Sequence, residues 1–248
     1  GLVDTEYGVV AERFCSLADP DGLPRIIREK RVDGAFIVGL PYSSQFIANM
    51  KDSGIPFVVV GVGSFEDGVD SIYADPEEGT ELMTQELIDT GHRKICLLNS
   101  AKNVRSHADR LRGYQRALRK NGMAIREDWN IGGINNSGRS AYEAFKQFWE
   151  AGNRPDSVAC ANGQSASGVM TYLYEQGIRV PEDISLISID DSELAEMAEV
   201  RLTSVHHPTD YLGKKAAENL LHMMQNRSFD GTYEFITQIV ERDSVKKL

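Results

Sequence analysis

Polar side chains that could hold a small ligand follow three apolar runs of the chain. They are Ser106 and Arg110 after the run 94–98, Asn162 after the run 157–161, and Asp190 after the run 184–189. If these runs are neighbouring parallel strands, their carboxyl ends meet at one edge of a sheet, which is where open α/β sheets bind ligands. A carboxylate that accepts hydrogen bonds and a guanidinium that donates them would suit a polar metabolite.

The same residues also have simpler interpretations, and their spacing leaves both open. Asn162, and Asp191 or Ser192, could cap the helices that follow them. Arg110 could lie on a solvated helix face together with the cations that follow it, which are Arg112, Arg116, Arg119 and Lys120.

A catalytic interpretation is weaker. The segment Gly163-Gln164-Ser165-Ala166-Ser167 nearly matches the nucleophile elbow G-x-S-x-G, and Asp190 and His206 or His207 follow in the chain order of that triad. However, Ser167 replaces the second glycine, and no HGGG-like segment for an oxyanion hole precedes it. We therefore expect that the protein is not an enzyme.

We also expect neither a cofactor nor a metal ion. Gly61-Val62-Gly63 follows an apolar run, but Glu66 stands where a dinucleotide-binding motif needs its third glycine. His206 and His207 are adjacent, so on a strand they point to opposite faces and cannot hold one metal together. The segment Gly91-His92-Arg93-Lys94 is interpreted as a helix C-cap with cations at the negative end of the helix dipole.

Short apolar runs alternate with amphipathic segments, which predicts an α/β fold with parallel sheets. The expected strands are 35–38, 56–60, 94–98, 157–161 and 184–189, with a last one at 233–240. The expected helices are 43–53, 77–90, 106–121, 138–151 and 164–177, with later ones at 193–199 and 210–225. Glycines end the first five helices, at Gly54, Gly91, Gly122, Gly152 and Gly177.

Composition narrows the class of protein. The 248 residues carry 27 Lys and Arg against 37 Asp and Glu, a formal charge of −10, which disfavours binding of nucleic acid by this chain alone. The three cysteines, Cys15, Cys96 and Cys160, form no C-x-x-C pair, which favours a reduced, cytoplasmic location. No apolar stretch approaches the ~20 residues of a membrane span, so we expect no membrane contact.

Nine short motifs follow one another from about Leu23 to the C-terminus. They are Arg31-Val32-Asp33-Gly34, Gly54-Ile55-Pro56-Phe57-Val58, Gly91-His92-Arg93-Lys94-Ile95, Arg110-Leu111-Arg112-Gly113-Tyr114, Val180-Pro181-Glu182-Asp183-Ile184-Ser185, Ile189-Asp190-Asp191, Leu202-Thr203-Ser204-Val205, Leu212-Gly213-Lys214-Lys215-Ala216 and Val240-Glu241-Arg242-Asp243-Ser244. In this order they resemble the effector-binding domain of LacI/GalR-family transcriptional regulators, which has a type I periplasmic-binding-protein-like fold.

The resemblance implies two Rossmann-like lobes, which we place at residues 1–92 with 205–228 and at residues 93–204 with 229–248. It implies a small polar effector, often a sugar, bound between the lobes. Arg110, Asn162 and Asp190 match the family's ligand-binding positions, and Ser106 and Asn135 fall at further pocket positions.

The resemblance also implies a homodimer that binds DNA through an N-terminal helix-turn-helix module, which these 248 residues do not contain. The family has two β-α units before the position of Val32, whereas 31 residues precede it here. We therefore expect that the start of the first lobe is truncated. A solute-binding receptor of a sugar transport system would share the fold and is the alternative function.

Overall fold

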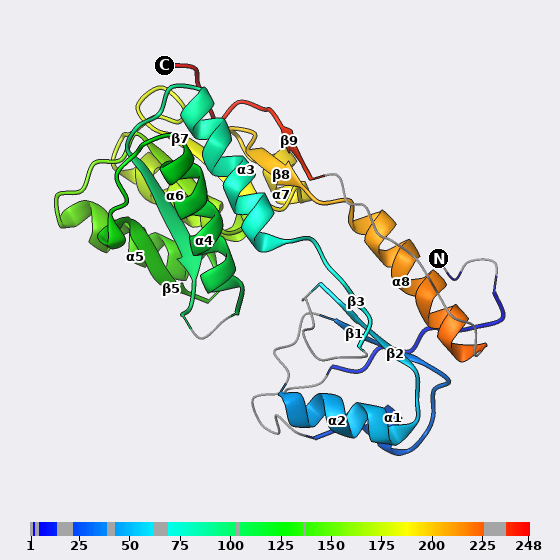
Figure 1. Ribbon diagram of the computed structural model, residues 1–248. Helices are drawn as coiled ribbons and strands as arrows, with labels where there is room; N and C mark the ends of the chain where they lie inside the picture. Colours follow the sequence, from blue (N-terminus) through cyan, green and yellow to red (C-terminus); the bar gives the residue numbers. More distant parts are fainter. Residues whose placement is uncertain are drawn as a thin grey trace. The chain divides into compact units, whose positions relative to one another are not determined.

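Strands and helices alternate along the chain in the computed structural model shown in Figure 1. It describes residues 2, 5–13, 22–38, 43–61, 69–102, 105–135, 137–225 and 237–248. The chain forms two units, residues 1–74 with 208–235 and residues 75–207 with 236–248, and each is described by itself. The chain passes from one unit to the other at 74/75, at 207/208 and at 235/236.

The smaller unit is a parallel sheet with helices on both faces. Its elements are α1 (Arg25–Arg28), β1 (Ala35–Val38), α2 (Ser44–Ser53), β2 (Phe57–Val60), β3 (Ser71–Ile72) and α8 (Thr209–Met224), and its strand order is β1-β2-β3. Alternate residues of β2 face opposite sides, as the two-residue period of a strand requires. Phe57 and Val59 pack with α1 and α2, whereas Val58 packs against α8.

The larger unit repeats this arrangement around a longer sheet with the order β5-β4-β6-β7-β8-β9. Its strands are β4 (Ile95–Ser100), β5 (Asn130–Ile134), β6 (Ser157–Cys160), β7 (Ser185–Ile189), β8 (Thr203–His206) and β9 (Gln238–Val240). Its helices are α3 (Pro76–Asp89), α4 (Arg105–Lys120), the 3-10 helix η1 (Glu127–Trp129), α5 (Gly138–Glu150), α6 (Gly163–Glu175) and α7 (Glu193–Met197). All ladders are parallel except β8–β9, which is antiparallel.

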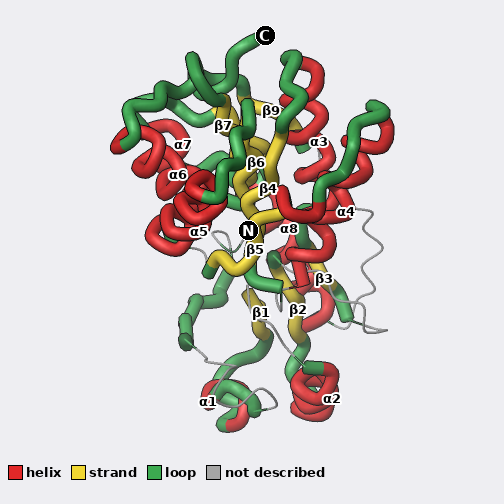
Figure 2. Tube along the Cα trace, turned by 90° about the vertical axis from the view of Figure 1, so that its left-hand side faces the viewer, coloured by secondary structure: helices red, strands yellow, loops and turns green. Residues whose placement is uncertain are grey.

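Two helical layers cover the larger sheet (Figure 2). In that view α3 and α4 lie on one side of the strands, and α5 and α6 lie on the other. Along β4, Ile95 and Leu97 pack in the cluster under α3 and α4, whereas Cys96 and Leu98 pack in the cluster under α5 and α6. Cys96 and Cys160 are free and buried, and burial raises the pKa of both thiols, so they are inert core residues.

The predicted strands and helices are present within a few residues, and each of the five glycines that end helices has a positive φ. Only the end of the strand predicted at 233–240 is described, as β9, and Cys15, Val62, Gly63 and Glu66 lie outside the described residues. β3, β5 and β8 were not among the predicted strands, and α1 and η1 were not among the predicted helices. β5 contains Gly132 and Gly133, which are uncommon in strands, and β8 is a short run that contains Thr203 and Ser204.

The boundaries of the two units differ from the predicted division at 92/93, 204/205 and 228/229. The largest difference concerns α3, which was predicted in the first unit and belongs to the second. The reason is packing: Met83 and Leu87 of α3 lie in one hydrophobic cluster with Tyr114 of α4 and Ile187 of β7.

The cationic C-cap predicted for residues 91–94 is correct for Arg93 and wrong for His92. Arg93 Nη1 donates to the carbonyls of Ile88 and His92 at 2.9 and 2.8 Å. His92 is fully buried, and burial lowers its pKa, so the ring is neutral at pH 7. Its Nδ1 lies 3.0 Å from the Leu87 carbonyl and must donate, which leaves Nε2 to accept from Ser185 Oγ at 2.9 Å. His92 thus joins the end of α3 to the start of β7.

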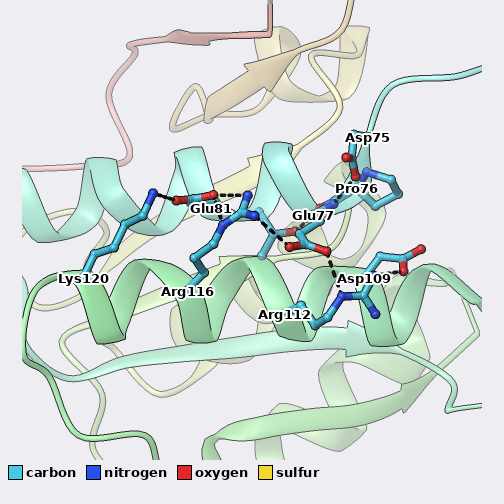
Figure 3. A network of polar contacts seen from close by, with 9 residues as sticks. Asp75, Pro76, Glu77, Glu81, Asp109, Arg112, Arg116 and Lys120 are labelled. Atoms are coloured by element: carbon cyan, nitrogen blue, oxygen red, sulfur yellow. Dashed lines mark hydrogen bonds and ion pairs between the residues drawn. The ribbon is translucent and has the colours of Figure 1, made fainter.

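Glycines allow the two pairs of helices to approach closely. A Cβ on Gly113 of α4 would lie 2.1 Å from the Glu77 carbonyl oxygen of α3, and one on Gly168 of α6 would lie 2.0 Å from the Gly138 carbonyl oxygen of α5. The close approach of α3 and α4 also lets half-buried glutamates and exposed cations form a network of ion pairs (Figure 3). Glu77 and Glu81 of α3 pair with Arg112, Arg116 and Lys120 of α4.

We predict that Gly113→Ala lowers the free energy of unfolding by about 1–3 kcal/mol, because the added methyl group forces two backbones apart. Gly213→Ala in α8 is the matched control, since a Cβ there meets nothing within 4 Å. It should instead stabilise the protein by up to about 1 kcal/mol by restricting the unfolded chain. Urea unfolding followed by circular dichroism measures both, and equal midpoints for the two variants would contradict the packing argument.

Candidate functional site

The register of the larger sheet brings the ends of its strands level. Leu98 of β4 pairs with Cys160 of β6, and Cys160 pairs with Ser188 of β7. Ser100, Asn162 and Asp190 each lie two residues beyond these level positions, so all three are at the carboxyl edge of the sheet. Asn135 follows β5 at this edge, because Ile134 pairs with Ser100. The strand ends predicted to meet therefore do so.

Arg110 turns toward the end of β4 and not toward the solvated face of α4. Its Nη1 donates to Ser106 Oγ at 3.0 Å and to Ser100 Oγ at 3.3 Å. Its Nε is buried and has no hydrogen-bond partner in the described part of the chain. Burial lowers the pKa of the guanidinium, and the charges of Asp190 and Asp109 oppose this effect, so the group stays a cation with an unused donor.

Asp190 supplies an acceptor beside this donor. It follows β7 with φ +75, and no hydrogen bond reaches its carboxylate from the residues that the structure describes. Asp190 is solvent-exposed by surface area, yet desolvation by the surrounding protein raises the pKa of its carboxyl, against the opposing charges of His207 and Arg110. A carboxylate that is partly desolvated and lacks a donor is stabilised when a ligand hydroxyl binds it.

His207 belongs to the same edge and was not among the predicted site residues. It follows β8, and its Nδ1 is buried without a partner in the part of the chain that the structure covers. Burial lowers its pKa, so the ring is neutral at pH 7, and the charge of Asp190 opposes this shift. The rule that selected Asp190 would have selected His207 as well if β8 had been predicted as a strand.

The two asparagines have structural contacts. Asn162 caps α6, because its Oδ1 accepts from the backbone N of Ser165 at 2.8 Å and from Ser165 Oγ at 2.9 Å. Asn135 Oδ1 accepts from Ser137 Oγ at 2.9 Å in the exposed loop before α5. The capping interpretation is thus correct for the oxygen of Asn162. The buried Ser165 hydroxyl donates to this cap, and this arrangement does not suit a nucleophile.

Asp191 is not a helix cap but the centre of a polar cluster. Its Oδ1 lies 2.6 Å from Arg242 Nη2 and accepts from Ser204 Oγ at 2.8 Å, and its Oδ2 lies 3.2 Å from His206 Nδ1. Arg242 Nη1 also donates to the Leu202 carbonyl at 2.8 Å. These contacts lower the pKa of Asp191 and attach the loop that carries Asp190 to β8 and to the segment after β9.

Metal and membrane features were sought among the described residues. They contain no group of three or more His, Cys, Asp or Glu side chains that could hold a metal ion. None of their helices is long and apolar enough to cross a membrane.

Comparison with known proteins identifies the family. The sequence model of the periplasmic binding protein-like domain matches residues 84–245. The HTH-type transcriptional repressor PurR of Vibrio atlanticus is 37% identical over 227 residues, which cover 90% of this chain and 67% of that protein. A crystal structure of a LacI-family sugar-binding transcriptional regulator from Escherichia coli, complexed with phosphate, matches with a TM-score of 0.81 and 25% identity, over 90% of this chain and 81% of that one. The chain belongs to the LacI/GalR family of transcriptional regulators.

Another LacI-family regulator, from Enterococcus faecium with bound ribose, matches with a TM-score of 0.77 and 26% identity over 90% of this chain and 82% of that one. The predicted α/β fold, like that of type I periplasmic binding proteins, is therefore confirmed. The chain is an effector-sensing part of a LacI/GalR-type regulator and not an enzyme, as the sequence predicted.

We predict that Asp191→Asn lowers the free energy of unfolding by about 3 kcal/mol, because it leaves the guanidinium of Arg242 without its countercharge in a largely buried place. The two side chains are only 13% and 15% exposed. The matched control is Asp243→Asn, which breaks the ion pair between Asp243 and Arg201. The side chains of Arg201 and Asp243 are 57% and 50% exposed. This control should cost less than about 1 kcal/mol. Urea unfolding compares the two variants, and equal losses would show that burial of the Asp191 pair is unimportant.

Proposed function

We propose that the carboxyl edge of the larger sheet binds the small polar effector of this regulator through Arg110 and Asp190. The carrying observation is geometric. Arg110, held at the end of β4 by Ser100, has a buried Nε without a partner, and the Asp190 carboxylate at the level end of β7 receives no hydrogen bond, both among the residues that the structure describes. His207 contributes a third polar group, whose buried Nδ1 has no hydrogen-bond partner in the described part of the chain. Ser106, Asn135 and Asn162 lie at the same edge and complete the proposed site.

This set of groups favours a ligand that carries both hydroxyl donors and acceptors. Asp190 accepts from ligand hydroxyls, while Arg110 donates to a ligand oxygen or ring nitrogen, so a molecule without such groups leaves both charges unpaired. Sugars and nucleosides have this chemistry. The ribose found in the regulator from Enterococcus faecium supports a sugar or a ribose-containing metabolite here.

The effector acts by shifting a conformational equilibrium that a DNA-binding module reads. Such coupling typically amounts to about 1–3 kcal/mol between two sites. We propose that a helix-turn-helix module outside these 248 residues binds DNA, and that the whole regulator works in the cytoplasm. The relatives are named as HTH-type repressors, which favours this role over a receptor of a transport system.

We predict that a thermal-shift screen of sugars, nucleosides and free nucleobases finds a ligand whose stabilising effect is lost in Asp190→Asn. A ligand at about 100 times its dissociation constant stabilises the fold by about 2.7 kcal/mol, which gives a clear shift. Asparagine is the replacement of choice because it tolerates the positive φ of residue 190. Asp243→Asn removes the same charge at an exposed place and should bind the ligand as the wild type does.

The Asp190→Asn variant should lose ligand binding without a loss in the free energy of unfolding. Because the pKa of Asp190 is raised above 3.8, the folded state holds this proton more tightly than the unfolded chain. The corresponding stability is present at low pH and is lost as the pH rises from 3.8 through the folded-state pKa. The neutral asparagine avoids this loss, so at pH 7 the variant should be at least as stable as the wild type. Ligand binding that survives in Asp190→Asn would refute the proposed site.

We also propose that the chain forms a homodimer through the face of α6 and α7. Tyr174 on α6 and Met197 on α7, two helices that contact each other, are 80% and 81% exposed and are the most exposed large apolar side chains among the described residues. We predict that light scattering gives twice the chain mass of 27.5 kDa, and that Tyr174→Lys with Met197→Lys gives a folded monomer. A wild-type monomer at micromolar concentration would contradict the proposal, and a dimer that persists in the double variant would exclude this face.

A further inference from the structure

A second candidate site lies at the amino edge of the same sheet. A pocket of about 570 Å³ opens there. Its lining residues are Arg93, Lys94, Ile95, Tyr114, Leu118, Met123, Ala124, Arg126, Trp129, Gly152, Asn153 and Arg154. We propose that this pocket binds a small organic anion of the phosphate-monoester class, independently of the effector site.

The pocket is distinct from the proposed effector site. Arg93 and Lys94 come directly before β4, whereas Ser100 is the last residue of that strand. Six residues of strand span about 20 Å, so the two places lie at opposite edges of one sheet. A ligand at one edge is therefore not in contact with Arg110 or Asp190.

The charge of the pocket is unusual for this acidic chain. Arg93, Lys94, Arg126 and Arg154 line it, and no acidic residue does. Arg126 is paired with Asp128 at 2.8 Å. Among the described residues no acidic side chain forms an ion pair with the other three cations. The nearby Asp156 carboxylate accepts instead from the backbone N of Arg93 and Lys94, at 2.9 and 2.8 Å.

Two of these cations are held in place before any ligand binds. Arg93 Nη1 donates to the carbonyls of Ile88 and His92, and Arg154 Nη1 donates to those of Trp149 and Asn153, both at 2.7 Å. The Arg154 guanidinium also lies 4.4 Å from the centre of the Trp149 ring. Nε and Nη2 of both arginines have no acceptor in the described part of the chain. Fixed donors of this kind bind an anion with little loss of side-chain entropy.

The rest of the pocket lining is apolar and aromatic, which favours an anion that carries an apolar organic group. Met123 and Ala124 supply the accessible apolar surface, over a floor of Tyr114, Leu118 and Trp129, which are 2%, 2% and 5% exposed. The Tyr114 hydroxyl donates inward to the Ile95 carbonyl at 2.8 Å. Trp129 is only 5% exposed, and its indole N–H has no partner among the described residues. Three cations that have no acidic ion-pair partner among the described residues match a phosphate monoester, which carries close to two negative charges at pH 7, better than a single carboxylate.

The two tryptophans of the chain provide a direct readout, since Trp129 lines the pocket and Trp149 lies under Arg154. We expect titration with phenyl phosphate to change the tryptophan fluorescence of the wild type with saturation. Lys94→Gln with Arg154→Gln should weaken binding by about tenfold or more, as loss of charge-assisted hydrogen bonds requires. Arg139→Gln with Lys146→Gln, two cations of α5 that do not line the pocket, is the charge-matched control and should bind as the wild type does.

Each arm of the experiment can overturn the proposal. An absence of any saturable change, or equal affinities for the pocket variant and the control, would refute an anion site at this edge. If inorganic phosphate bound as tightly as phenyl phosphate, the proposed contact between the apolar lining and an organic group of the ligand would be refuted. Loss of binding in Asp190→Asn would place the probe at the carboxyl edge instead. Lys94→Gln alone is the control for misfolding, because the Lys94 side chain makes no hydrogen bond or ion pair in the described part of the chain. This single variant should bind phenyl phosphate more weakly while its circular dichroism spectrum stays unchanged.

Discussion

The parallel register of β4, β6 and β7 is the constraint on which both proposed sites depend. Because Leu98, Cys160 and Ser188 are level across the sheet, the residues that follow these strands emerge at one edge, and those that precede them emerge at the other. The carboxyl edge receives Asp190 and the groups around it, and the amino edge receives Arg93 and Lys94. The backbone ladder thus separates two sets of charged side chains without any contact between them.

The two adjacent aspartates that follow β7, Asp190 and Asp191, differ in their hydrogen-bond partners and in the direction of their pKa shifts. Asp191 has its carboxylate satisfied by Arg242, Ser204 and His206, and its pKa is lowered. Asp190 has no such partner among the residues that the structure describes, and desolvation raises its pKa. The first residue gives the loop its stability, and the second keeps an unsatisfied charge at the edge of the sheet. A binding site needs this combination, because a carboxylate already satisfied by the protein has little to gain from a ligand.

Local patterns predicted the fold well, since glycine stop signals and apolar runs act over a few residues. The same rule selected Arg110 and Asp190, which the structure places at one edge of the sheet. It failed where distant contacts decide the outcome. Gly132 weakens the strand pattern of β5, yet the chain packs closely there, since a Cβ would lie 3.1 Å from His107 Cε1 and the imidazole would have to shift to accept it. Nothing near Asp191 in the sequence indicates its pairing with Arg242, and the neutral state of His92 follows from burial beside Ser185.

The glycines at the two helix crossings also affect how the larger unit can open. Gly113 brings the backbones of α3 and α4 together, and Gly168 does the same for α6 and α5, on opposite faces of the sheet. Each pair is joined through main-chain contact, so neither helix of a pair can detach without exposing its partner. Partial unfolding should therefore proceed by whole layers, with α3 and α4 exchanging their amide hydrogens as one cooperative group and α5 and α6 as another.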